Sequence, residues 1–329
     1  MKKDTLLKLV KEQNRRVSAP LMGFPGAALT GTTIKENLCD AAKQLNSLIA
    51  LAQEVKPDII MPMMDLSVEC EALGLKITFP DNESPSVEEH PIRSSLDLGN
   101  LMPFKMDGSG RLKVFLDTVS GLKKNTDAKV CAYVCGPFTL AGLLMGATEI
   151  LITSYDDPES VKEITSYCTD FIREYSRALE ASGADIICIL DPTAVMLSPD
   201  TFMEFAGDYV AKVIADLNIP SILHICGNTT HLIDQMIETG VEGLSLDMDV
   251  DIQEVLERVP EDIVVIGNLD SKTVMPSAKV YNIIEETHRM LRRTAEYKNF
   301  VPSTGCDLPP ETPIDNIAAF SATVRAFAC

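Results

Sequence analysis

Short apolar segments alternate with helical patterns along this chain of 329 residues, and this alternation limits the possible folds more than any other feature. The segments are nearly continuous runs of Val, Ile, Leu and Met, which predicts strands buried on both faces, as in a parallel sheet covered by helices. We predict eight strands, at residues 19–24, 58–64, 129–135, 185–190, 220–226, 243–247, 263–269 and 300–305. Eight strands, each followed by a helix, are typical of a (β/α)₈ TIM barrel.

The segments between the strands support this prediction. Apolar side chains recur at helical spacing in residues 35–55 and 158–182. The alternative is an open doubly wound sheet, but no Gly-x-Gly-x-x-Gly sequence follows a predicted strand. We therefore expect a single domain over residues 1–329, with an N-terminal helix. Residues 75–107 break the repeat with several prolines and acidic residues, and we expect them to form a loop or lid over the barrel mouth.

A candidate metal site lies at the ends of two predicted strands. His224 and Cys226 are two residues apart, so on a strand their side chains point to the same face. Cys306 follows the last strand, and barrel active sites form at such C-terminal ends. One imidazole and two thiolates suit Zn²⁺, and three protein ligands leave a fourth position open for a substrate. The alternative is a packed histidine with two unrelated buried thiols.

Composition excludes several kinds of partner. The net charge is −19, whereas nucleic acids and anionic membrane surfaces select clustered Lys and Arg. The nine cysteines are scattered, and several lie in apolar runs, which is typical of a reducing compartment. No apolar run approaches the ~18–20 residues of a membrane span, and the N-terminus does not resemble a signal peptide. We expect a soluble, cytoplasmic protein with no nucleic-acid or membrane partner.

Most of the chain resembles the uroporphyrinogen decarboxylase superfamily, and within it the methylcobamide:coenzyme M methyltransferases. The resemblance is carried by residues 224–228, 305–306 and 310–316, and more weakly by residues 71–74, 136–139, 191–192 and 197–202. It implies a (β/α)₈ barrel with a catalytic zinc on His224, Cys226 and Cys306. It also implies methyl transfer from a methylated corrinoid to a thiol such as coenzyme M. Because the chain lacks an Asp-x-His-x-x-Gly corrinoid signature, a separate small corrinoid protein would carry the methyl donor, unless the corrinoid is free.

Four further residues are candidates for the site. Asp65 matches the pyrrole-binding aspartate of the decarboxylases, and Asp247 stands where the methyltransferases tend to have Glu. We predict catalytic roles for both, either on the acceptor or at the open position of the zinc, although each could simply cap a turn at a strand end. We predict that Asn228 and Asn268 bind substrate; for Asn228 the alternative is to cap the next helix.

Three functions remain open from the sequence. The first is a zinc-dependent methyltransferase that binds the acceptor thiol as a thiolate. The second is a decarboxylase of a pyrrolic substrate, although residues 19–26 lack the Arg that would grip its carboxylates. The third is a non-catalytic barrel that binds a corrinoid or a thiol. Coenzyme M, another small thiol and tetrahydrofolate all remain possible acceptors.

Overall fold

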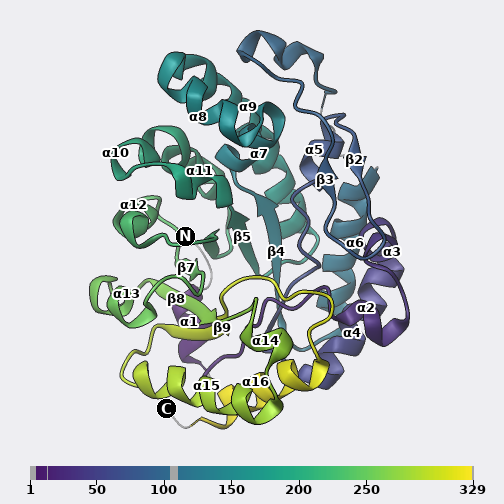
Figure 1. Ribbon diagram of the computed structural model, residues 1–329, viewed down its shortest axis with the longest axis vertical. Coiled ribbons are helices and arrows are strands. Elements are labelled where there is room, and N and C mark those ends of the chain that lie inside the picture. The colour runs from purple at the N-terminus through teal and green to yellow at the C-terminus, as the bar shows by residue number, and fades with distance from the viewer. Residues whose placement is uncertain (1–4, 13, 104–109, 328–329) are drawn as a thin grey trace.

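The computed structural model describes residues 5–12, 14–103 and 110–327, and its centre is one curled parallel sheet (Figure 1). Seven strands follow one another in the order β1-β4-β5-β6-β7-β8-β9. Their bounds are Ile59–Ile60, Lys129–Cys135, Ile186–Leu190, Ser221–Ile225, Gly243–Leu246, Val264–Leu269 and Phe300–Thr304. Each strand pairs in parallel with its neighbours, which confirms the predicted TIM-barrel architecture.

The prediction of an eighth strand at residues 19–24 is wrong, although this segment lies where that strand would be. The Ala19 N–H donates to the Pro302 carbonyl of β9 at 3.3 Å, and the Asp58 N–H donates to the Ser18 carbonyl at 2.9 Å, just before β1. A ladder does not form because Pro20 and Pro302 have no N–H to donate. The segment therefore closes the barrel between β9 and β1 through isolated hydrogen bonds.

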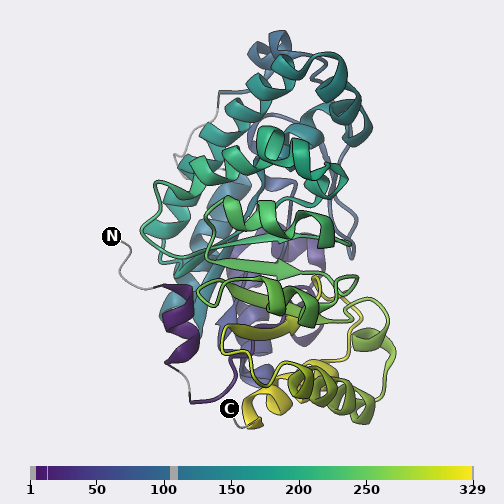
Figure 2. The same ribbon diagram turned by 90° about the vertical axis from the view of Figure 1, so that its left-hand side faces the viewer.

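Helices surround the sheet on its outer face (Figures 1 and 2). The predicted helix at 35–55 divides at Asp40, whose side chain caps the second part by accepting from Ala42 N and Lys43 N. The predicted helix at 158–182 is confirmed as α9. The α-helices of the described chain are α1 Leu6–Lys11, α2 Gly26–Thr30, α3 Ile34–Cys39, α4 Ala41–Val55, α5 Val68–Ala72, α6 Gly110–Asn125, α7 Pro137–Met145, α8 Ala147–Asp156, α9 Pro158–Ala181, α10 Pro199–Phe202, α11 Asp208–Ile214, α12 Ile233–Glu238, α13 Ile252–Arg258, α14 Val274–Ser277, α15 Val280–Arg293 and α16 Ile314–Ala326.

The inside of the barrel has its own apolar core. It contains alternate residues of the strands, among them Ile186, Cys188 and Leu190 of β5 and Ile222 of β6. The same period of two that turns Ile222 inward also turns His224 inward. The core thus sets the direction of the first candidate metal ligand.

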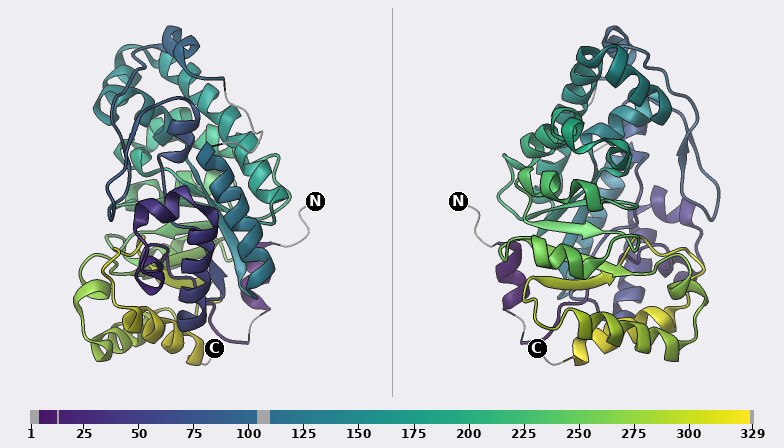
Figure 3. Two further views of the ribbon diagram at one scale, coloured as in Figure 1. Left: turned by 90° about the vertical axis from the view of Figure 1, so that its right-hand side faces the viewer. Right: turned by 60° about the vertical axis from the view of Figure 1, so that its left-hand side comes forward.

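Helix α1 fills the end of the barrel at which the strands begin. Leu6 and Val10 belong to the inner core, and Leu6 packs against Gly243 at the start of β7. A Cβ at Gly243 would lie 2.6 Å from Leu6 Cδ2, so only glycine leaves room for this helix. Figure 3 shows α1 at the end of the barrel from which the strand arrows point away.

The segment predicted as a lid is irregular in its described part, and residues 104–107 lie outside the described residues. It forms a short hairpin, β2 Ile77–Thr78 and β3 Ser86–Val87, followed by the 3₁₀ helix η1 Ser95–Asn100. Ser84 and Pro85, in the hairpin loop, line a cavity that also contains Cys306. This segment therefore reaches the barrel end that carries the candidate site.

No single helix in the described ranges is long and apolar enough to cross a membrane. Only the bent pair α7 and α8 meets the length and composition requirements together, and every residue of α7 except Leu143 is buried.

Candidate metal centre

His224, Cys226 and Cys306 come together at the C-terminal end of the barrel. His224 is on β6, Cys226 directly follows that strand, and Cys306 lies two residues after β9. His224 Nε2 is 3.1 Å from Cys226 Sγ and 3.9 Å from Cys306 Sγ, and the two sulfurs are 3.5 Å apart. Among the described residues, these three form the one cluster whose ligand atoms could share a metal ion.

The trio has the dimensions of a zinc site. Tetrahedral zinc has bonds of about 2.3 Å to sulfur and 2.0–2.1 Å to nitrogen, which places neighbouring ligand atoms roughly 3.5–3.8 Å apart. The three observed separations bracket this range. On the other side of the ring, His224 Nδ1 lies 2.9 Å from Ser245 Oγ, and this contact turns Nε2 toward the thiols. The residues present therefore fit Zn²⁺.

Asp247 holds the loops that carry the two cysteines. Its Oδ2 accepts from Gly227 N at 2.8 Å and its Oδ1 accepts from Met248 N at 2.6 Å. Gly305 passes so close that a Cβ there would lie 2.6 Å from Met248 N. The Asp247 side chain is 0% exposed, so it lies behind the cysteines as a support for their backbone.

The two thiols interact even before a metal is considered. The hydrogen-bond contact with Cys306 Sγ lowers the pKa of Cys226 against the opposing effect of burial. The same interaction, together with burial, raises the pKa of Cys306. Cys226 is therefore the first of the pair to become a thiolate.

Asp65 is near the centre, but its oxygens already have partners. Oδ1 accepts from Ser67 N at 2.8 Å and from Ser67 Oγ at 2.6 Å, and Oδ2 forms an ion pair with Arg111. Arg111 also pairs with Glu71 and lies over the Phe79 ring at 4.5 Å. Arg111 could not be singled out from the sequence, because one arginine at a helix start has no pattern that reveals its burial.

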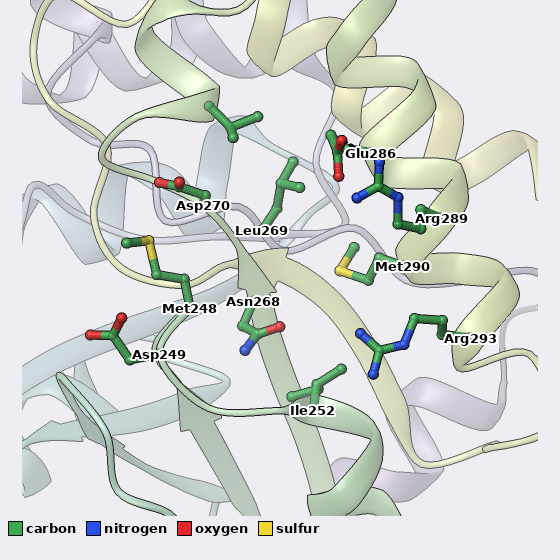
Figure 4. A pocket seen from close by; sticks show the side chains of 11 residues that line it. Met248, Asp249, Ile252, Asn268, Leu269, Asp270, Glu286, Arg289, Met290 and Arg293 are labelled. Carbon is green, nitrogen blue, oxygen red and sulfur yellow. Dashed lines mark hydrogen bonds and ion pairs between the residues drawn. The ribbon is translucent and has the colours of Figure 1, made fainter.

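The two asparagines predicted to bind substrate make their side-chain hydrogen bonds with backbone groups. Asn228 is exposed, and its Oδ1 accepts from Thr230 N at 3.1 Å, as in a turn cap. Asn268 Nδ2 donates to the carbonyls of Asp247 and Val250, at 2.8 and 2.7 Å, and so braces the loop after β7. Figure 4 shows Asn268 in the wall of a separate cavity of about 300 Å³.

A second cavity, of about 340 Å³, has Cys306 in its wall and is mainly apolar. The residues that line it are Phe24, Met64, Asp65, Leu66, Ser84, Pro85, Cys306, Asp307, Leu308, Pro309 and Pro310. We call it the mouth cavity. It is the space from which a small molecule can reach Cys306, one of the three candidate metal ligands.

Asp307 is a residue of this cavity to which the sequence analysis assigned no role, although it directly follows Cys306. Its Oδ2 is buried, and burial, together with the charge of Cys306, raises its pKa. The Tyr133 hydroxyl, on β4, is also buried; burial, and secondarily Asp307, raises its pKa. Within the described chain, neither Asp307 Oδ2 nor the Tyr133 hydroxyl has a hydrogen-bond partner.

Two more carboxyl groups are buried at the ends of neighbouring strands. Burial raises the pKa of Glu69 to about 7, although its Oε1 accepts from Cys135 N at 2.8 Å. Burial likewise raises the pKa of Asp191 to about 6, against hydrogen bonds from the backbone and hydroxyl of Thr139. Burial thus favours the protonated form of both carboxyl groups relative to exposed carboxyl groups.

Fold and site together define a class: barrel enzymes whose residues for chemistry lie at the C-terminal ends of the strands. Residues 15–327 match the uroporphyrinogen decarboxylase (URO-D) family. The chain belongs to this family, as its motifs led us to expect.

The relatives within the family indicate a narrower group of enzymes. A methylcobamide:CoM methyltransferase of Methanosarcina mazei is 30% identical over 264 residues, covering 77% of this chain and 75% of the relative. A uroporphyrinogen decarboxylase of Prochlorococcus marinus is 27% identical, covering 80% of this chain and 78% of the relative. A solved methyltransferase structure from Methanosarcina mazei has a TM-score of 0.86 at 24% identity, covering 97% of this chain and 96% of the other, which confirms the fold. The predicted resemblance to the methyltransferases is confirmed, and the chain is a methyltransferase-type enzyme of this family.

Proposed function

We propose that this protein transfers a methyl group from a methylated corrinoid, carried by a separate small corrinoid protein, to a small thiol. Zinc on His224, Cys226 and Cys306 would bind the acceptor thiol and hold it as a thiolate. One observation carries the proposal: the three ligand atoms lie at zinc-site distances, and one of them is in the wall of a cavity large enough for a small substrate. The names of the methylcobamide:CoM methyltransferase relatives support the corrinoid donor and the thiol acceptor.

The chain's own residues prepare this site in three ways. Ser245 fixes the ring of His224, and Asp247 fixes the loops on which the cysteines lie. The apolar walls of the mouth cavity keep water away from a thiolate, which leaves it more reactive toward a methyl group. We propose that Asp65, held by Arg111 at the cavity wall, shapes the acceptor's place rather than exchanging protons.

The decarboxylase alternative has less support. A porphyrinogen with many carboxylates needs cationic partners. The described lining of the mouth cavity offers two carboxyl groups, Asp65 and Asp307, and no Lys or Arg.

The test combines metal analysis with turnover. Zinc-loaded protein is mixed with methylcobalamin and a panel of small thiols, and demethylation is followed in the cobalamin spectrum. We expect about one zinc per chain and zinc-dependent demethylation, both lost in Cys226→Ser and Cys306→Ser. Cys39→Ser, which changes an exposed cysteine, is the matched control.

Other results would separate the alternatives. Equal zinc in all four proteins would exclude the metal site. Release of CO₂ from uroporphyrinogen without metal would favour the decarboxylase. Thiol or cobalamin binding without any turnover would favour the non-catalytic barrel.

A further inference from the structure

A third cavity lies at the end of the barrel that α1 fills, beside the start of β9. Its volume is about 290 Å³, close to the lower limit of roughly 300 Å³ for small-ligand pockets. Its described lining contains cations and no acidic residue, although the whole chain has a net charge of −19. The lining residues are Val10, Lys11, Asn14, Arg15, Arg16, Lys298 and Phe300. We call this space the basic cavity, and its charge favours an anionic ligand.

The protein itself holds the two arginines of the basic cavity in place. Arg16 is 3% exposed, and its guanidinium donates to four backbone carbonyls within residues 294–300. Arg15 binds Asp58 through both terminal nitrogens, with Nη1 2.7 Å from Oδ2 and Nη2 2.6 Å from Oδ1. Asp58 balances the charge of Arg15, so the other three cations give the cavity its positive excess. Because the guanidiniums are already ordered, a ligand does not have to order them on binding.

Arg15 still has donors that a ligand can use. A guanidinium has five N–H donors. The bonds to Asp58 and to the Arg16 carbonyl use three of those of Arg15. Within the described chain, no group accepts from Arg15 Nε or from the second hydrogen of Nη2. The side chain is 26% exposed, and Nε and Nη2 together form a fork that matches two oxygens of an oxyanion.

Lys11 and Lys298 supply the mobile charges of the basic cavity. Both are exposed, and neither has an ion pair among the residues that the structure describes. Lys11 is the last residue of α1, whereas Lys298 lies two residues before β9. The acidic residues nearest to them in sequence, Glu12 and Glu296, are exposed and do not line the cavity. An anion between the two ammonium groups is therefore held from two separate segments.

We propose that the basic cavity binds a small ligand with a phosphate or diphosphate group, through Lys11, Lys298 and the open edge of Arg15. A diphosphate has enough oxygens to meet the fork of Arg15 and both ammonium groups together, which a single carboxylate cannot do. The bound anion links the end of α1 to the segment before β9, and so stabilises the filled end of the barrel. The site shares no residue with the candidate metal centre or the mouth cavity, so it does not depend on the proposed function.

Calorimetry on the full chain tests the proposal with inorganic phosphate, pyrophosphate and malonate, while sodium chloride keeps the ionic strength constant. We expect saturable binding of about one pyrophosphate per chain, roughly tenfold tighter than phosphate because of its higher charge, and weaker binding of malonate. Metal content is measured before and after, so that removal of metal by pyrophosphate is not counted as binding. Adenosine diphosphate distinguishes the source of the phosphate group: an affinity equal to that of pyrophosphate indicates a free diphosphate, and a higher one indicates a nucleotide.

Variants test the residues of the basic cavity. The double variant Lys11→Gln/Lys298→Gln changes two exposed side chains, so it should fold, and it should bind pyrophosphate about tenfold more weakly or worse. Lys76→Gln/Lys124→Gln removes the same charge from exposed positions elsewhere and should leave the affinity within about twofold of the wild type. Arg15→Lys keeps a cation beside Asp58 but has no fork, so it should also weaken pyrophosphate binding.

Three results would overturn the proposal. The first is the absence of saturable binding at constant ionic strength. The second is an equal loss of affinity in the two lysine double variants, which would mean that pyrophosphate responds only to the net charge of the chain. The third is tighter binding of malonate than of pyrophosphate, which would refute the phosphate class of the ligand.

Discussion

Asp247 shows how a side chain that is not a ligand can support the candidate metal centre. One of its oxygens accepts from the N–H of Gly227, directly after Cys226, and the other accepts from Met248, in its own loop, against which Gly305 packs closely. Gly227, which follows Cys226, has φ 83°, a conformation that glycine adopts at little cost. Ligand placement therefore depends on residues that are not ligands.

The first prediction concerns this support. Asp247→Asn replaces one acceptor with an amide NH₂ that faces a backbone N–H. We expect zinc affinity to fall roughly 10–100-fold, the usual effect of losing a supporting contact. Competition with a chromophoric chelator measures it. The matched control is Asp249→Asn, which changes an exposed residue of the same loop. An equal loss of zinc affinity in this variant would show that the effect comes from the charge of the loop and not from the hydrogen bonds of Asp247.

The second prediction concerns Glu69, because burial raises its pKa from the ordinary value of 4.5 to about 7. Between these values the unfolded chain loses the proton and the folded chain keeps it, so stability falls as pH rises through that window. At pH 8 the ionised group costs about 3 kcal/mol, because the shift of about 2.5 pKa units corresponds to 1.36 kcal/mol per unit. Glu69→Gln should therefore be more stable than the wild type at pH 8, and the advantage should shrink toward pH 5. Urea unfolding at both pH values measures this, with exposed Glu83→Gln as control; a pH-independent difference would contradict it.

At the scale of elements, strands could be predicted from the sequence where a run of Val, Ile or Leu contains no proline. The prediction for β4 matches the observed bounds, and those for β5 to β9 differ from the observed bounds by at most one residue at each end. The failures have prolines in them: Pro20 prevents a ladder at residues 19–24, and Pro62 follows shortly after β1, which is only Ile59–Ile60. The period of two also predicted that His224 and Cys226 would converge. It could not predict Asp307 or Arg111, because their burial and partners come from distant segments.

Arg111 joins three elements, which leads to the third prediction. It pairs with Asp65 after β1 and Glu71 of α5, and it lies over Phe79 in the hairpin. Arg111→Ala leaves the Asp65 carboxylate buried without its partner, so we expect a loss of about 3–5 kcal/mol in the free energy of unfolding. Lys113→Ala, on the same helix with an exposed ion pair, should cost at most about 0.5 kcal/mol. Similar losses in urea unfolding of the two variants would contradict this.

At the scale of the whole molecule, one end of the barrel contributes to the core and the other end carries the candidate site. Helix α1 and the inner core fill the end where strands begin, and the metal ligands lie at the other end. The fourth prediction follows. Leu6→Ala opens a void in the inner core and should cost about 2–5 kcal/mol of stability, yet leave zinc content unchanged. Denaturant unfolding and metal analysis measure both; zinc loss in a folded variant would show that the ends are coupled.

For the proposed methyl transfer, the filled end of the barrel implies an order of binding and release. In the described structure, α1 closes the interior from below, so acceptor and donor must both arrive through the mouth. A corrinoid protein docked there would cover the mouth cavity, so the thiol has to enter first and the methyl thioether has to leave last. The thioether should then inhibit competitively against the thiol and noncompetitively against the corrinoid protein; competition with the corrinoid protein alone would contradict this order. Because only one end of the barrel is open, the methyl thioether can dissociate only after the corrinoid protein has dissociated.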